Sequence, residues 1–106
     1  MTSNREIVLS WMFDVIHEYH HGVCDTFDLA VHIYDEGLKH LPLPAESLQL
    51  LAAVSMLIAS KFVTNVLPFK ISTLIYYSED FLTYDDIVFM ERTVLFKLDW
   101  KISHVT

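Results

Sequence analysis

The stretch LQLLAAVSMLIA, residues 48–59, decides the fold class of this 106-residue chain. Its only polar residues are Gln49 and Ser55, so a helix formed here would be apolar nearly all round. Such a helix is typical of one surrounded by other helices, and it is shorter than the roughly 20 residues of a membrane span. We therefore expect a buried central helix that starts after Pro44 and runs to about Phe62.

The rest of the chain has few places to turn, because it contains 2 glycines and 3 prolines. Apolar residues at helical spacing on both sides of the central segment predict four further helices. The spacing of Ser3 and Glu6, and of Thr83 and Asp86, is that of N-terminal capping boxes. The expected helices cover about 4–21, a segment capped by Thr26 or Asp25 that ends near 37–40, about 68–77 and about 84–97. We predict an all-α fold of five helices in one domain over residues 1–106, with the third helix buried.

The composition bounds the class of partner. Hydrophobic residues make up 53% of the chain, more than the core of one small domain absorbs, so part of this surface is expected to face a partner. A net charge of −7 argues against nucleic acid and against an anionic membrane. The single cysteine excludes an internal disulfide, and residues 1–5 lack the features of a signal peptide. We expect an intracellular protein of the nucleus, the cytoplasm or both.

Enzymatic motifs carry little weight in this sequence. HEYHH at residues 17–21 matches the H-E-x-x-H pattern of zinc proteases, but no third ligand follows at a suitable place, and a histidine beside Gly22 simply complements a helix end. Cys24 precedes Asp25, whose carboxylate disfavours a thiolate nucleophile. Two isolated glycines cannot form a phosphate-binding loop. The sequence therefore predicts neither an enzyme nor a metal or cofactor site.

Two charged residues stand in apolar surroundings: Lys61 at the end of the central segment and Glu91 within VFMERTVL. Together with the segments around them, they make the whole chain resemble the N-terminal cyclin box of the cyclins, the activating subunits of cyclin-dependent protein kinases. The similar segments, in order, are REIVLSW (5–11), TFDLAV (26–31), YDEGL (34–38), LQL (48–50), ASKF (59–62) and ME (90–91), followed by Leu95, Leu98 and Trp100 in the last helix and a strand-like exit. The residues most strictly kept in the family are present as Arg5, Asp35, Leu50, Lys61 and Glu91.

The resemblance implies a kinase-binding surface around Lys61 and Glu91. These two side chains would hydrogen-bond main-chain groups beside the regulatory αC helix of a kinase, and charge-assisted bonds of this kind are directional. Apolar contact area would come from Phe62, Leu57, Ile58 and Phe89. Arg5 and Asp35 would form a buried ion pair between the first two helices, with a structural role. The protein would bind a cyclin-dependent kinase and would itself do no chemistry.

The resemblance also implies a shallow groove for Arg-x-Leu peptides of substrates or inhibitors. Trp11, Asp14 and Gln49 occupy matching positions, with Asp14 meeting the peptide arginine, while Asn4 and Val8 stand where larger apolar residues are usual.

Departures from the family pattern leave alternatives open. Val63 and Thr64 replace a glutamate pair, Glu36 replaces an arginine, and a second cyclin box is not expected. We expect a truncated, viral or divergent cyclin. A non-activating adaptor or decoy, or a cyclin-like domain of the transcription-factor type, are the alternatives.

Overall fold

The structure is a computed structural model that describes residues 4–20, 24–63 and 68–105. Its elements are α1 (Asn4–His20), α2 (Cys24–His40), the 3₁₀ helix η1 (Ala45–Ser47), α3 (Leu48–Phe62), α4 (Ile71–Tyr77) and α5 (Tyr84–Val105). The described residues contain five α-helices and no strand. The predicted all-α fold is confirmed.

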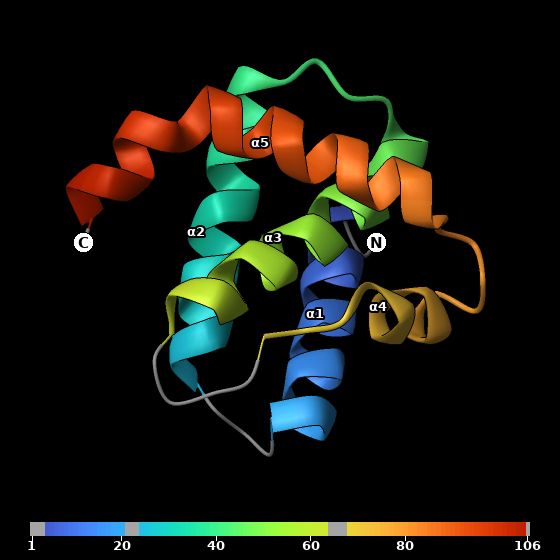
Figure 1. Ribbon diagram of the computed structural model, residues 1–106. Helices are drawn as coiled ribbons and strands as arrows, with labels where there is room; N and C mark the ends of the chain where they lie inside the picture. The colour runs from blue at the N-terminus through green and yellow to red at the C-terminus, as the bar shows by residue number, and fades with distance from the viewer. Residues whose placement is uncertain (1–3, 21–23, 64–67, 106) are drawn as a thin grey trace.

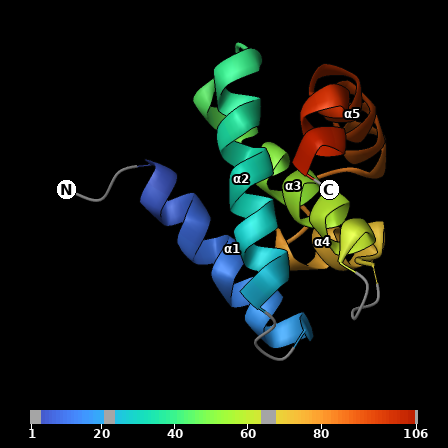
Figure 2. The same cartoon turned by 90° about the vertical axis from the view of Figure 1, so that its left-hand side faces the viewer.

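Helix α3 lies in the middle of the molecule, between the pair α1 and α2 on one side and α5 on the other (Figures 1 and 2). Every residue from 51 to 60 is buried. The two serines of this stretch are satisfied locally: Ser55 Oγ donates to the carbonyl of Leu51 at 2.8 Å, and Ser60 Oγ donates to the carbonyl of Leu57 at 2.8 Å. The central helix predicted from residues 48–59 is therefore the core helix of the fold.

The window Ala45–Phe62 is long and apolar enough to cross a membrane, with a mean hydropathy of 1.2. Its central position explains this composition, because 56% of the window is buried inside the fold. A core helix surrounded by other helices needs apolar residues on all its sides.

Helices α2 and α3 approach closely at Gly37. A Cβ atom at this position would lie 2.9 Å from Cδ1 of Leu51, a fully buried side chain of α3. Gly37 lies within α2, which continues to His40. Because glycine has no side chain, it leaves room for Leu51.

Several predicted helix ends are wrong. Helix α2 begins at Cys24, so Thr26 lies within its first turn and does not cap it. The side chain of Thr26 is buried, and its Oγ1 has no hydrogen-bond partner in the described part of the chain. Helix α4 begins at Ile71, beyond Pro68. Helix α5 continues through Val105 in place of the expected strand-like exit, because no glycine or proline follows Lys97 to end it. Ser3, Gly22 and Thr64 lie outside the described residues.

Thr83 caps helix α5, as its spacing from Asp86 predicts. The backbone N–H of Asp86 donates to Thr83 Oγ1 at 3.2 Å, which satisfies one of the free N–H groups of the first turn. We expect Thr83→Ala to lower the free energy of unfolding by about 1 kcal/mol, measured by denaturant unfolding followed by circular dichroism. Thr83→Ser keeps the acceptor oxygen and serves as the control. Equal stability of Thr83→Ala and the parent would show that the cap contributes nothing.

Candidate functional site

Lys61 and Glu91 meet on the surface where the end of α3 reaches the first half of α5. Nζ of Lys61 lies 2.6 Å from Oε2 of Glu91, and the two side chains are 49% and 14% exposed. An ammonium group has three donors and a carboxylate can accept several hydrogen bonds. The contact between them therefore leaves donors and acceptors of both residues for a partner's main chain.

Two aromatic residues close in sequence to this ion pair are exposed. Phe62, at the end of α3, is 43% exposed, and Phe89, two residues before Glu91, is 71% exposed. Both rings present apolar surface to solvent, and their place in a kinase-binding surface stays a prediction.

Leu57 and Ile58 do not belong to this surface. They are 2% and 1% exposed, because α3 is covered on both sides until its last turn. Their assignment to the kinase-binding surface is therefore wrong: they pack in the core beneath it.

Arg5 and Asp35 join α1 to α2 through a two-pronged ion pair. Arg5 Nε donates to Oδ1 at 3.2 Å, and Nη2 donates to Oδ2 at 3.0 Å. The hydrogen bonds to Asp35 and its negative charge raise the pKa of Arg5. The side chains are 50% and 37% exposed, so the pair exists but the prediction that it is buried is wrong. It lies at the outer edge of the α1–α2 contact, where water reaches both groups.

A groove of about 400 Å³ lies between α1, η1, the start of α3 and the segment before α5. It brings together Val8, Trp11 and Gln49 of the predicted peptide-docking groove. Asp14 does not line it. The other lining residues, which the sequence did not indicate, are Ile7, Ala45, Glu46, Leu48 and Phe81. The indole of Trp11 is held by a hydrogen bond from Nε1 to the carbonyl of Tyr77 at 3.2 Å.

An acidic hollow of about 440 Å³ adjoins this groove and is lined by Glu18, Tyr76, Tyr77, Glu79 and Asp80. Trp11 of the groove donates a hydrogen bond to the carbonyl of Tyr77 of the hollow, and the consecutive residues Asp80 and Phe81 line the hollow and the groove, respectively. Burial raises the pKa of the Tyr77 hydroxyl, and the nearby Glu18 carboxylate adds to this effect. The carboxylates that line the hollow are those of Glu18, Glu79 and Asp80.

Within the described part of the chain, no group of three His, Cys, Asp or Glu side chains gathers. His17 stacks on Phe13 with ring centroids 5.7 Å apart. His21 lies outside the described residues, and the side chain of Cys24 is not described.

Residues 1–103 match the family model of the cyclin N-terminal domain. The chain is 34% identical over 99 residues to the G2/mitotic-specific cyclin-B of Spisula solidissima, covering 93% of this chain and 23% of the relative. It is 36% identical over 104 residues to the G1/S-specific cyclin-D1 of Xenopus laevis, covering 96% of this chain and 34% of the relative.

Among solved structures, the X-ray structure of a viral cyclin from herpesvirus saimiri matches with a TM-score of 0.79 and 33% identity. The match covers 92% of this chain and 42% of the viral cyclin. The chain thus spans about a quarter to a third of the length of these two curated relatives, and less than half of the viral cyclin. Family model, curated relatives and fold agree, and the chain belongs to the cyclin family, with its described helices forming a cyclin N-terminal domain.

Proposed function

We propose that this chain is a regulatory subunit that binds a cyclin-dependent protein kinase and activates it by positioning the kinase αC helix. The observation that carries the proposal is the Lys61–Glu91 pair, 2.6 Å apart, in which Lys61 is 49% exposed and is followed in sequence by the exposed Phe62. A charged pair with an exposed phenylalanine next to it in sequence suits a partner that presents both main-chain polar groups and apolar side chains.

The pair would act on the kinase by holding one helix in place. The free N–H groups of Lys61 donate to main-chain carbonyls beside αC, and the Glu91 carboxylate accepts from main-chain N–H groups there. Bonds with a charged partner are shorter and stronger than neutral ones, so they fix the position of the helix. With αC in place, its glutamate pairs with the lysine of kinase strand β3, which completes the phosphate-binding site.

Binding and activation are tested separately with one purified cyclin-dependent kinase. Binding is measured with the chain immobilised, and activation is measured as phosphate transfer to a substrate protein. The proposal predicts both. Binding without phosphate transfer would instead support a non-activating adaptor or decoy, and absence of binding across a panel of such kinases would contradict the proposal.

A second candidate function is docking of Arg-x-Leu peptides, favoured by the apolar groove beside the acidic hollow. The groove offers Trp11, Val8 and Phe81 to a leucine side chain, and the hollow offers the carboxylates of Glu79 and Asp80 to an arginine. Hydrogen bonds between a guanidinium and carboxylates give such a site its preference for arginine. Its partner is therefore a short extended segment of a substrate or inhibitor.

We expect Phe81→Ala to lower the affinity for a fluorescent Arg-x-Leu peptide about tenfold, which corresponds to about 1.4 kcal/mol. Phe81 is 62% exposed, so its loss removes contact area without opening the core. Fluorescence anisotropy measures the affinity, and Phe13→Ala, a 50% exposed phenylalanine outside the groove, is the control. If the peptide binds both variants and the parent equally, or binds none of them, the docking proposal is wrong.

A further inference from the structure

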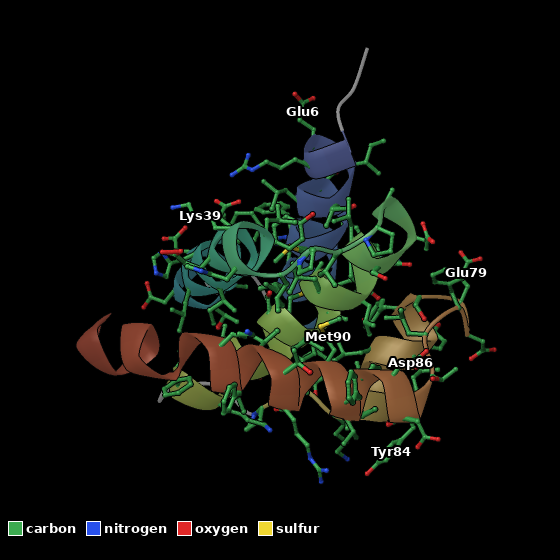
Figure 3. All side chains as sticks on the ribbon, turned by 90° about the horizontal axis from the view of Figure 1, so that it is seen from above. Glu6, Lys39, Glu79, Tyr84, Asp86 and Met90 are labelled. Atoms are coloured by element: carbon green, nitrogen blue, oxygen red, sulfur yellow. The ribbon has the colours of Figure 1, made fainter. Side chains whose placement is uncertain are left out.

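The outer face of α5 is aromatic, although it points away from the fold. Ile87, Met90 and Val94 are buried and form the inner face of the helix. On the opposite face, at helical spacing, lie Asp85, Phe89, Arg92 and Phe96, with Phe89 71% and Phe96 82% exposed. In Figure 3, Met90 points toward the body of the molecule and Tyr84 away from it. A helix face that packs on nothing normally carries polar residues.

Charge is distributed unevenly along this outer face. Its start is acidic, with exposed Asp85, while its second half carries Arg92 and Lys97. Neither of these two cations has an ion-pair partner among the residues that the structure describes. Phe89, Arg92, Thr93, Phe96 and Lys97 line a shallow hollow of about 380 Å³. The face is therefore acidic at one end, basic at the other and aromatic along its length.

We propose that this face binds the same face of a second copy of the chain, with the two α5 helices antiparallel. A helix rises about 1.5 Å per residue, so Asp85 and Arg92 are about 10 Å apart, with Phe89 near their midpoint. Two antiparallel helices centred there bring Asp85 of each copy opposite Arg92 of the other. A parallel pair would instead bring like charges together, and like-charge contacts oppose association.

The aromatic side chains determine how much surface this pair buries. Near the two-fold axis, Phe89 of one copy meets Phe89 of the other, and each Phe96 lies just beyond the start of the opposite helix. Full burial of an aromatic side chain removes about 150–250 Å² from water, so the exposed parts of Phe89 and Phe96 supply about 300 Å² per copy. A stable interface needs about 800 Å² per partner. The charged side chains add to the rings, and we therefore expect a weak dimer that dissociates on dilution.

The test is the mass of the purified chain in solution, measured by analytical ultracentrifugation across the micromolar range. The parent is expected to shift from monomer to dimer as its concentration rises, and added salt is expected to weaken the dimer. Phe96→Lys and Arg92→Glu each weaken it more than tenfold. Tyr76→Lys replaces an aromatic residue of α4 that is 73% exposed and leaves the dimer unchanged.

The register of the pair is tested by exchanging the charges. Asp85→Lys alone weakens the dimer, whereas Asp85→Lys combined with Arg92→Glu restores it, because each new lysine again faces a carboxylate. Circular dichroism confirms that each variant keeps its helices. A monomer at all concentrations, a dimer insensitive to Phe96→Lys, or failure of the double exchange to restore association would overturn the proposal. None of these outcomes depends on kinase binding.

Discussion

The double variant Lys61→Glu/Glu91→Lys is expected to keep the fold and lose kinase binding. Exchange of the two residues preserves an ion pair between α3 and α5, and an exposed pair of this kind contributes only about 0–1 kcal/mol to stability. The polarity seen by the kinase is reversed, however. Main-chain carbonyls that would accept from Lys61 then face a carboxylate, and main-chain N–H groups that would donate to Glu91 face an ammonium group.

The expected loss of affinity is large because two groups act together. A hydrogen bond to a charged group contributes about 1.5–3 kcal/mol. Loss of the hydrogen bonds made by both Lys61 and Glu91 therefore lowers the affinity for the kinase by at least about a hundredfold. Binding of a purified cyclin-dependent kinase by isothermal titration measures the loss, and thermal unfolding verifies that the fold survives. Lys39→Glu is the matched control, since Lys39 of α2 is 69% exposed and 3.9 Å from Glu36. A double variant that binds as tightly as the parent would show that the pair is not the anchor.

Leu51→Ala is expected to cause the largest loss of stability. Leu51 is fully buried in α3 against Gly37 of α2, and removal of a buried leucine side chain costs about 3–5 kcal/mol through lost contacts and the cavity left behind. This is a large part of the roughly 5–15 kcal/mol that stabilises a domain. For a domain of this size we expect Tm to fall by more than about 10 °C, measured by calorimetry.

The same contact predicts that the effect of Gly37→Ala depends on residue 51. In the parent, the added methyl group lies 2.9 Å from Cδ1 of Leu51 and forces that side chain to move. In the Leu51→Ala background the methyl group enters the space left by leucine, and alanine favours the helix by about 1 kcal/mol over glycine. The change in the free energy of unfolding caused by Gly37→Ala should therefore be more stabilising in the Leu51→Ala background than in the parent. Equal effects in both backgrounds would show that the two residues are not coupled.

The sequence predicted the elements of this fold better than their ends. Residues 48–59 are apolar nearly all round, as in a helix covered by others, and they are fewer than a membrane span needs, so the burial of α3 followed from composition and length. The start of α2 did not, because Thr26 has the residue type of a cap but packs inside the fold. The sequence also failed to predict the burial of Leu57 and Ile58. They are close to Lys61 in sequence, but this does not reveal which side of α3 the other helices cover.

Some residues of the candidate sites could be grouped from the sequence, and others could not. Residues that lie within one helical face, such as Phe89 and Phe96, could have been grouped from their spacing and their position opposite Ile87 and Met90. Phe81 and Glu46 of the groove could not, because they come from a loop and from a 3₁₀ helix whose positions depend on tertiary packing. The contribution of Glu79 and Asp80 to the acidic hollow likewise depends on tertiary packing, because both lie in a turn with positive φ angles of 56° and 64°.

Ser60 has a consequence for the kinetics of association. Its buried Oγ donates to the carbonyl of Leu57 and accepts from the backbone N–H of Phe69 at 2.9 Å, so the residue before Lys61 is held from two sides. A partner therefore meets a backbone that is already ordered, which lowers the entropy lost on binding. For a surface of this kind, we expect related kinases to associate at similar rates and to differ in how long each stays bound.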